Sequence, residues 1–518
     1  MLEVSTFVEM GPQRLAGMYL VPRTSPLPAW VGADAIPVDE PAGPIRPIAT
    51  TCPDPDGPLR RAFLDLINSG QRKVLLASFL FADGEVARAL ARVAERLRGG
   101  VYVLTALGRG FRVDLGDAEG LDPHSRGSER REQHITNLKL LADAGVWLRS
   151  APDLHAKLCV IDDREALVTS ANVTSEAFDR NPENGLILRS PALARELGRA
   201  FARVFLHHSR EESPPAATLN VGSVRSSLGP RWRRLTRSEP DQVVATISDD
   251  EQSIMEAILD LLQSARSEIV LTAYSAVGLQ DHPVGVALRS AVGRGVRVLA
   301  VLPPDNRAAD RRDTGAWLFR GAKEGQVVVR GLAYTHAKAI VSDGVRALVW
   351  TGNLDGHHGF EDGFEVGVTT SRPEVARALR AYVVTLANKA QYTALFDPTL
   401  EQLAAACGTT SGISGDWVIE LPTHAFWRPS ELADALKRSA ISFTRRGGEL
   451  TLGIEGIAEL IGTVDASNHR LKVERIISKP TNPSRPEGYL GPCRLRVTRD
   501  AGPEASKGRA RRGGDRRS

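Results

Sequence analysis

Residues 155–172 have the sequence HAKLCVIDDREALVTSAN, and residues 336–353 repeat its pattern as HAKAIVSDGVRALVWTGN. In each copy a Lys follows the His by two residues, an Asp by seven and an Asn by seventeen, and the copies begin 181 residues apart. Identical spacing in two places indicates an internal repeat. The alternative, ordinary strands with incidental polar residues, can explain one copy but not both.

Each copy is expected to form a β-hairpin. Apolar runs at residues 158–161 and 339–341 favour buried strands, turn residues follow them, and a second apolar run follows each turn. A His and a Lys two residues apart on a strand point to the same face, and the Asn beyond the return strand can come back beside them. An imidazole, an ammonium and a carboxamide around one small volume suit an anion with several oxygens, such as a phosphate group.

These paired strings resemble the HKD motifs of the phospholipase D superfamily, and the resemblance covers roughly residues 58–385. In that family a Gly-Ser-x-Asn element follows the motif, and an acid further on orients the His. Here the leading Gly is replaced in both copies, whereas a hydroxyl residue and the Asn are kept. The residues that match are Ser170 and Thr351 for the hydroxyl, and Glu183 and Glu365 for the acid.

The resemblance implies a phosphodiesterase that forms a covalent phosphohistidine. One His attacks phosphorus, and the other protonates the leaving oxygen and then activates water. Many relatives use the His of the first copy as the nucleophile, which favours His155, with His336 as the acid. No metal or other cofactor is expected, because the protein's own cations hold the phosphate. The assigned residues are His155 and His336 for the reaction, Lys157, Lys338, Asn172 and Asn353 for the phosphate oxygens, Glu183 and Glu365 for orienting the imidazoles, Asp162 and Asp343 for bracing the hairpins, and Ser170 and Thr351 as substrate contacts.

The segments around the two motifs alternate between strand-like and helix-like patterns in the same order. The apolar run KVLLASF at residues 73–79, for example, is matched by EIVLTAY at residues 268–274. We therefore predict an α/β fold of two similar phospholipase D-like halves, related by a pseudo-twofold, with one site at their seam, and a small C-terminal α+β or β-rich domain. The predicted organisation is a loop-rich extension (1–57), a first half (58–208), an Arg-rich linker (209–242), a second half (243–390), a small domain (410–500) and a disordered basic tail (501–518).

The overall charge does not by itself indicate a nucleic-acid substrate, but one segment has a suggestive composition. The net charge of +4 equals the excess of the tail, which has six Lys or Arg against two Asp or Glu, so the rest of the chain is neutral overall. The linker combines several arginines with a tryptophan, a combination that can grip phosphates and stack a base. A solvated linker is the equal alternative. The residues concerned, as tentative substrate contacts, are Arg231, Trp232, Arg233 and Arg234.

The substrate prediction follows from these features. The first residues show no signal peptide, no run approaches eighteen apolar residues, and the four cysteines are isolated, so we expect a cytoplasmic protein without a membrane span or zinc site. The arginine-rich linker and basic tail then favour a nuclease or another nucleic-acid phosphodiesterase. The alternative is a phospholipid hydrolase or transphosphatidylase of the cardiolipin-synthase type. A scaffold with an inactive site is disfavoured, because both motifs are intact.

Overall fold

The structure of the chain, a computed structural model, divides into two compact units. One unit comprises Ser25–Ala309 and Asp313–Ala394, and the other comprises Met1–Thr24, Asp310–Arg312 and Leu395–Ser518. The structure describes residues 6–10, 18–23, 26–32, 43–51, 57–97, 100–108, 127–215, 218–225, 227, 229–232, 240–248, 250–303, 318, 322–355, 360–396, 417–421, 441–443, 450–452, 457–465, 470–478 and 494–499.

The first half of the larger unit is a sheet with the strand order β11-β10-β6-β5-β4-β7-β8-β9-β3. Strands β4, β5 and β6 are parallel and are connected through α2 and α3, whereas β7, β8 and β9 continue the sheet as an antiparallel meander. The elements are β3 (Ile45–Ala49), α1 (Pro58–Ser69), β4 (Val74–Ala77), α2 (Gly84–Leu97), β5 (Val101–Leu104), α3 (Gly127–Asp143), β6 (Trp147–Ser150), β7 (Leu158–Ile161), β8 (Glu165–Thr169), α4 (Ser175–Asp179), β9 (Asn184–Leu188), α5 (Pro191–His207), β10 (Glu211–Ser213) and β11 (Gly222–Ser223).

The second half repeats this topology. Its sheet runs in the order β13-β12-β21-β19-β18-β14-β16-β17-β22, again with three parallel strands, β14, β16 and β17, followed by the antiparallel strands β18, β19 and β21. The elements are β12 (Asp241–Ile247), β13 (Glu251–Gln252), α6 (Ser253–Ser264), β14 (Glu268–Thr272), β15 (Ala276–Val277), α7 (Pro283–Gly293), β16 (Arg297–Leu302), β17 (Val327–Gly331), β18 (Ala339–Ser342), β19 (Arg346–Trp350), β20 (Leu354–Asp355), β21 (Phe364–Thr370), α10 (Pro373–Lys389) and β22 (Tyr392–Phe396). The predicted pair of α/β halves is confirmed.

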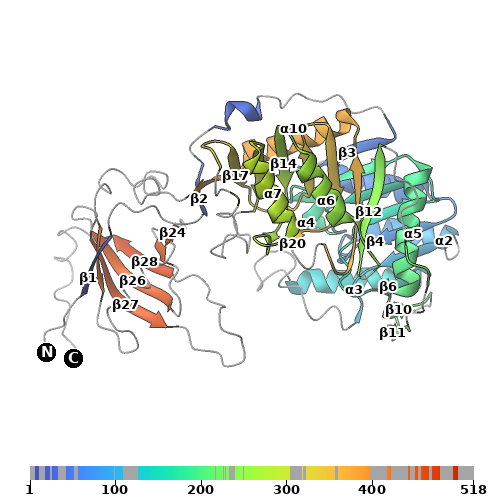
Figure 1. Cartoon of the computed structure of the whole chain (residues 1–518). Helices are drawn as coiled ribbons and strands as arrows, with labels where there is room; N and C mark the ends of the chain where they lie inside the picture. The colour runs from blue at the N-terminus through green and yellow to red at the C-terminus, as the bar shows by residue number, and fades with distance from the viewer. Residues whose placement is uncertain are drawn as a thin grey trace, which may run out of the picture. The chain divides into compact units, whose positions relative to one another are not determined.

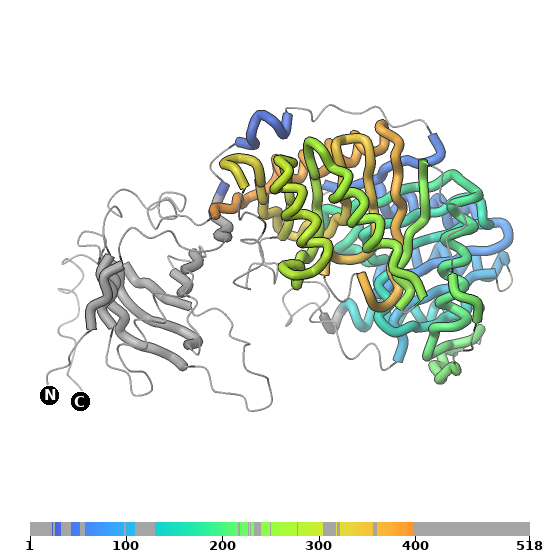
Figure 2. The backbone as a smooth tube through the Cα atoms, viewed as in Figure 1, coloured from blue at the N-terminus to red at the C-terminus, as the bar shows by residue number. Residues whose placement is uncertain are grey.

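A shared hydrophobic core joins the two halves. Successive residues of a strand face opposite sides of the sheet, so Leu75 and Ala77 of β4 lie in one core while Val74 and Leu76 lie in another. The core that holds Leu75 also takes in residues of both sheets and of α5 and α10. On the second sheet, α6 and α7 lie side by side (Figure 1), and Figure 2 follows the same backbone from blue to orange. Because the core is continuous, the ends of the two hairpins are held against one another.

The described part of the other unit contains a sheet with the order β1-β23-β27-β26-β28-β25-β24. Its β26 and β27 form an antiparallel pair, and β26 and β28 are parallel. The strands of this unit are β1 (Thr6–Met10), β2 (Met18–Pro22), β23 (Trp417–Leu421), β24 (Ile441–Phe443), β25 (Leu450–Leu452), β26 (Ile457–Asp465), β27 (Arg470–Ser478) and β28 (Arg494–Arg499). The predicted tail, residues 501–518, lies outside the described residues.

Two segments predicted to be rich in loops contain strands that pair with the first sheet. In the N-terminal extension, β3 pairs with β9. In the predicted linker, β10 pairs with β6. These strands are short, and β3 contains Pro47, which lacks an N–H and is tolerated because β3 ends the sheet. Segments of three to five residues carry too little periodicity to be recognised without their partners.

A buried histidine ties two loops of the first half together. His134 of α3 is 1% exposed, its Nδ1 accepts the N–H of Phe81 at 2.9 Å, and its Nε2 lies 3.0 Å from the carbonyl of Ala106. Because one ring nitrogen must accept and the other donate, the ring is neutral. Burial lowers the pKa of His134 from 6.5 to about 4.

We expect the free energy of unfolding to fall as the pH drops from 6.5 to about 4. Over that range the unfolded chain binds a proton that the folded chain does not, and the full difference corresponds to about 3 kcal/mol. Urea unfolding at pH 7 and pH 4.5 measures the effect, and His134→Gln is expected to remove this part of the pH dependence. An unchanged pH dependence in the variant would contradict this assignment.

Candidate active site

The two motif aspartates anchor the hairpin turns. The Asp162 carboxylate accepts the backbone N–H groups of Gln71, Arg72 and Lys73, each at 2.8 Å, just before β4. Asp343 accepts the corresponding groups of Arg266, Ser267 and Glu268 at the start of β14, at 3.0, 2.8 and 3.0 Å. Both aspartates have left-handed backbones, with φ of 51° and 54°. Partial burial alone would raise the pKa of Asp162, but the donated N–H groups hold the pKa below its ordinary value. These contacts brace the hairpin against the neighbouring strand.

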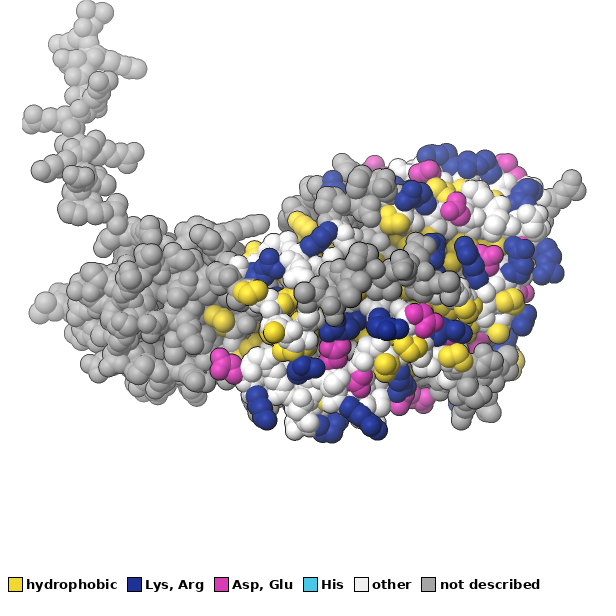
Figure 3. Space-filling model, turned by 90° about the horizontal axis from the view of Figure 1, so that it is seen from above, with side chains coloured by type: hydrophobic (Ala, Val, Ile, Leu, Met, Phe, Trp, Pro, Cys, Tyr) yellow, Lys and Arg dark blue, Asp and Glu magenta, His cyan; other side chains and the backbone are white. Residues whose placement is uncertain are grey.

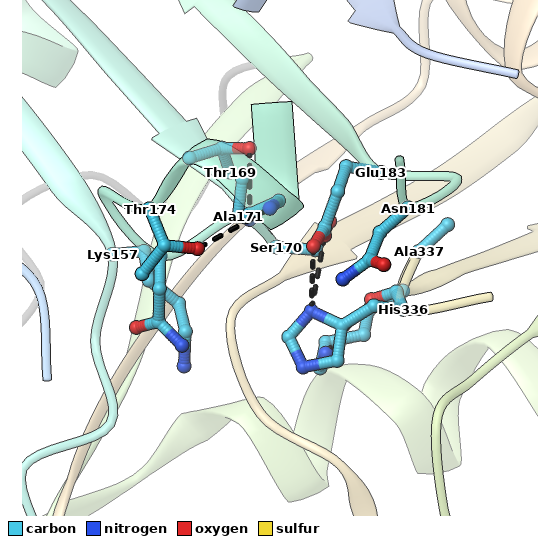
Figure 4. A network of polar contacts seen from close by, with 12 residues as sticks. Lys157, Thr169, Ser170, Ala171, Thr174, Asn181, Glu183, His336 and Ala337 are labelled. Atoms are coloured by element: carbon cyan, nitrogen blue, oxygen red, sulfur yellow. Dashed lines mark hydrogen bonds and ion pairs between the residues drawn. The ribbon is translucent and has the colours of Figure 1, made fainter. Parts of the chain in front are cut away.

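The catalytic candidates form two His–Glu pairs, and each pair crosses the seam between the halves. His155 Nδ1 lies 2.6 Å from Glu365 Oε1. His336 Nδ1 lies 2.9 and 3.0 Å from the two oxygens of Glu183, and Figure 4 shows the carboxylate directed at this ring. Each imidazole is therefore oriented by the half that does not carry it. Because each His needs the acid of the other half, neither half has a complete His–Glu pair by itself.

The hydroxyl residues after each motif hold these glutamates. Ser170 donates its hydroxyl to Glu183 Oε2, and Thr351 donates its hydroxyl to Glu365 Oε2, both at short range. The structure thus gives Ser170 and Thr351 partners other than the substrate contact predicted from the sequence. A carboxylate needs several donors when it is buried, and the glutamates are 0% and 1% exposed.

The two motif lysines bring positive charge into the same volume. Both are fully buried, and each ammonium donates to the backbone carbonyl of its own motif histidine, Lys157 to His155 at 2.6 Å and Lys338 to His336 at 2.8 Å. The charges of both lysines act on both imidazoles and lower the pKa of each. Because the lysine of each half acts on the histidine of the other half, the charged groups of the two motifs belong to one site.

The protonation states follow from burial and pairing. Burial lowers the pKa of both imidazoles below the ordinary histidine value, against the opposing effect of Glu365 on His155 and Glu183 on His336. Burial alone would raise the pKa of each glutamate, but the adjacent imidazole and lysine hold it below the ordinary value. Each pair is thus an ionised carboxylate that accepts the Nδ1–H of an imidazole. The lone pair of a neutral imidazole then lies on Nε2, the atom that can attack phosphorus or accept a proton.

The two histidines differ in their surroundings. The His155 side chain is 22% exposed, whereas that of His336 is 6% exposed. Among the described residues, His336 Nε2 has no hydrogen-bond partner although it is buried, and the same holds for Asn353 Oδ1. Asn172 Oδ1 lies 3.5 Å from the Ser78 hydroxyl. Buried polar atoms without partners are costly. His336 Nε2 and Asn353 Oδ1 are therefore candidates for contact with a substrate.

The linker residues predicted to bind nucleic acid do not present an exposed tryptophan beside the arginines. Trp232 is 3% exposed and packs in the shared core, so its ring offers no face for a base. Arg231 is exposed and lies 3.9 Å from Asp250. Arg233 and Arg234 lie outside the described residues. On the face seen in Figure 3, Lys and Arg side chains are scattered among Asp, Glu and uncharged groups.

Two residues near the site were missed from the sequence. Tyr274 packs edge-on against His336, with ring centroids 5.1 Å apart, and its ring lies 5.9 Å from Lys338 Nζ. Asn184 makes two hydrogen bonds to the backbone of Lys338. The signal for Tyr274 was available, because it ends the run that matches KVLLASF. Asn184 directly follows Glu183, but nothing in its own residue type marks it.

Two α/β halves of repeated topology thus meet around one centre with paired His–Glu contacts. The family model described as "Cardiolipin synthase, PLD-like domain" matches residues 63–205 and 258–386, just over half of the chain. The chain therefore belongs to the phospholipase D superfamily. The matched segments contain both motifs and both glutamates.

The individual relatives share only about a quarter of their aligned residues with this chain. The chain is 24% identical over 245 residues to the probable cardiolipin synthase YwiE of Bacillus subtilis (strain 168), covering 44% of each chain. It is 25% identical over 322 residues to cardiolipin synthase A of Pseudomonas aeruginosa (strain UCBPP-PA14), covering 60% of this chain and 61% of that one. The crystal structure of phosphatidylserine synthase from Haemophilus influenzae Rd KW20 aligns with a TM-score of 0.48 at 15% identity, covering 68% of this chain and 87% of that one. The chain thus spans less than two thirds of the length of the two cardiolipin synthases. Within its described part, no helix has the length and apolar character needed to cross a membrane.

Proposed function

We propose that this protein acts on the phosphodiester of a phospholipid head group, and transfers the phosphatidyl group to the hydroxyl of an acceptor through a phosphohistidine. The observation that carries the chemistry is the crossed pairing of His155 with Glu365 and of His336 with Glu183. The substrate class is supported by the relatives, whose names are those of cardiolipin synthases. The buried Trp232 removes one of the observations that favoured a nucleic acid.

The proposed reaction has two steps. In the first, the Nε2 lone pair of His155 forms a bond to phosphorus, the bond from phosphorus to the leaving alcohol oxygen breaks, and that oxygen takes a proton from His336 Nε2. In the second, an acceptor hydroxyl gives its proton to His336 and attacks phosphorus, and the electron pair of the breaking P–N bond returns to His155. Water as acceptor gives hydrolysis, and an alcohol gives transfer. The greater exposure of the His155 side chain, 22% against 6%, supports it as the nucleophile.

The glutamates and lysines of the site stabilise the charges that develop during the reaction. Glu365 accepts the Nδ1–H of His155 and so stabilises the positive imidazole that forms as Nε2 bonds to phosphorus. Lys157 and Lys338 supply positive potential for the phosphate oxygens in a water-poor site, where such charges act strongly. A bound phosphate anion raises the pKa of a nearby imidazole, which allows His336 to enter the first step protonated.

Vesicles of phosphatidylglycerol distinguish this proposal from nucleic-acid cleavage. With EDTA present, we expect the purified protein to release glycerol or form a new phosphodiester lipid, and His336→Ala to lose this turnover. Labelled DNA and RNA, single-stranded and duplex, are incubated in parallel under the same conditions. Cleavage of nucleic acid without any lipid turnover would overturn the proposed substrate class.

A further inference from the structure

One side-chain amide closes the seam on the His336 side. Asn184 begins β9 and is fully buried. Its Oδ1 accepts the backbone N–H of Lys338 at 2.7 Å, and its Nδ2 donates to the backbone carbonyl of Lys338 at 3.1 Å. A donor and an acceptor that engage the N–H and C=O of one residue reproduce the bond pair of neighbouring antiparallel strands. The amide thus acts as a strand partner for the segment that carries His336.

The matching position in the second half has no such group. Val366 follows Glu365 as Asn184 follows Glu183, and the backbones of both positions make the same contact, Ser170 N to Asn184 O at 2.8 Å and Thr351 N to Val366 O at 2.9 Å. The valine side chain has no donor or acceptor. The seam has two sides with matching backbone contacts, one at His336 and one at His155. The pair of amide hydrogen bonds is found on the His336 side and not at the matching position on the His155 side.

The backbone bonds explain why a side chain is needed on the His336 side. The backbone N–H of each motif histidine donates to the other half, His336 to Pro182 O at 2.9 Å and His155 to Phe364 O at 3.1 Å. Phe364 N then donates back to Asp153 O at 3.1 Å. Pro182 has no N–H and cannot make the equivalent return bond. The Asn184 amide adds two bonds at the seam where a backbone bond is missing.

The result is an unequal pair of histidines. On one side, Glu183 holds the His336 ring, Pro182 holds its backbone N–H, and Asn184 holds the backbone two residues on. Lys338, fixed in this way, donates its ammonium to the His336 carbonyl. On the other side, His155 has its glutamate and its backbone bond, and its side chain is more exposed.

We propose that Asn184 is a positioning residue that holds His336 and Lys338 at a fixed place, and thereby confers the role of proton donor on His336. This inference rests on the proposed roles of the two histidines. Proton transfer to a leaving oxygen requires the donor within hydrogen-bond reach, and a displacement on the order of 1 Å can cost about 100-fold in rate. The nucleophile must move toward phosphorus during the reaction, which suits the less constrained His155.

The test uses Asn184→Val, which introduces the residue of the matching seam, and Val366→Ala as the control, which trims the same position of the other half. Two phosphodiesters are compared, one with a p-nitrophenol leaving group, which departs without a proton, and one with an alkyl alcohol, which needs one. We expect Asn184→Val to lower kcat for the alkyl ester by about 10- to 100-fold, with KM within about twofold, and kcat for the p-nitrophenyl ester by less than about threefold. Val366→Ala is expected to affect both esters equally. An equal fall for both esters in Asn184→Val, or none, would overturn the positioning role.

A second measurement does not depend on turnover. Hydrogen exchange of the Lys338 amide, which donates to Asn184 Oδ1, is expected to accelerate at least about tenfold in Asn184→Val, while exchange of the Thr169 amide, which donates to Lys157 O, stays unchanged. If His336→Ala leaves the turnover of both esters intact, the proposed function fails, and the exchange rates still decide whether the pair of amide hydrogen bonds exists. Unchanged exchange at Lys338 would refute this pair of hydrogen bonds, whatever the activity.

Discussion

His155→Ala is expected to lower phosphodiester turnover by about 10⁴-fold or more while the protein remains folded. A residue that forms the covalent intermediate cannot be replaced by its neighbours, and removing such groups costs about 10⁴- to 10⁶-fold in other enzymes. The fold survives because the His155 side chain is partly exposed and contributes little to the core. Glu365 loses its imidazole partner in this variant and is expected to take up a proton, since an unpaired buried carboxylate is unfavourable.

The measurements are the rate of turnover, the thermal unfolding curve, and trapping of an acid-labile phosphoenzyme. His208→Ala is the matched control, because that side chain is 25% exposed and lies beside a carboxylate, Asp250, at 3.3 Å, outside the site. We expect the control to keep its activity and wild-type protein to form the phosphoenzyme. His336→Ala should form it slowly and only from substrates with a good leaving group. Full turnover in both His155→Ala and His336→Ala would refute the site.

Glu365→Gln is expected to lower turnover by about 10³-fold, the second-largest effect. The neutral amide no longer stabilises positive charge on His155, and an amide N–H turned toward Nδ1 would favour the tautomer with the proton on Nε2, which cannot attack. Because Glu365 acts only through His155, adding Glu365→Gln to His155→Ala should cost little more than His155→Ala alone. The crossed pairing makes this expectation specific, since Glu183, the acid that follows the His155 motif in the same half, pairs with His336 instead.

The pH profile gives an independent check on Glu365→Gln. The charge of Glu365 raises the pKa of His155, so removing it lowers that pKa further. If neutral His155 is the nucleophile, the acidic limb of kcat/KM should move to lower pH in the variant. Glu196→Gln, in which a buried glutamate of α5 is changed in the same way, serves as the control. An acidic limb that stays in place, or an equal loss in Glu196→Gln, would contradict the assignment.

The repeat explains how much was predictable from the residues alone. The spacing of His, Lys, Asp and Asn lies within one hairpin, and local spacing determines which side chains share a face of a strand. The predicted strands at residues 158–161 and 339–341 are accordingly β7 and most of β18. The strand-helix-strand order of each half is also local, because alternation and helical periodicity are properties of short windows. The superfamily followed from the same motifs.

The partners across the seam were decided by the tertiary structure. Which glutamate holds which histidine, why Ser170 and Thr351 face carboxylates, and where Asn184 bonds all depend on contacts between residues 13 to 210 positions apart in the chain. Trp232 shows the same limit, because its flanking arginines suggested an exposed ring whereas the shared core buries it. A sequence determines such contacts only through the packing of whole elements, here α5 and α10 in the core common to both sheets. The motifs themselves were therefore determined by the sequence alone, and their crossed assembly into one centre by the fold.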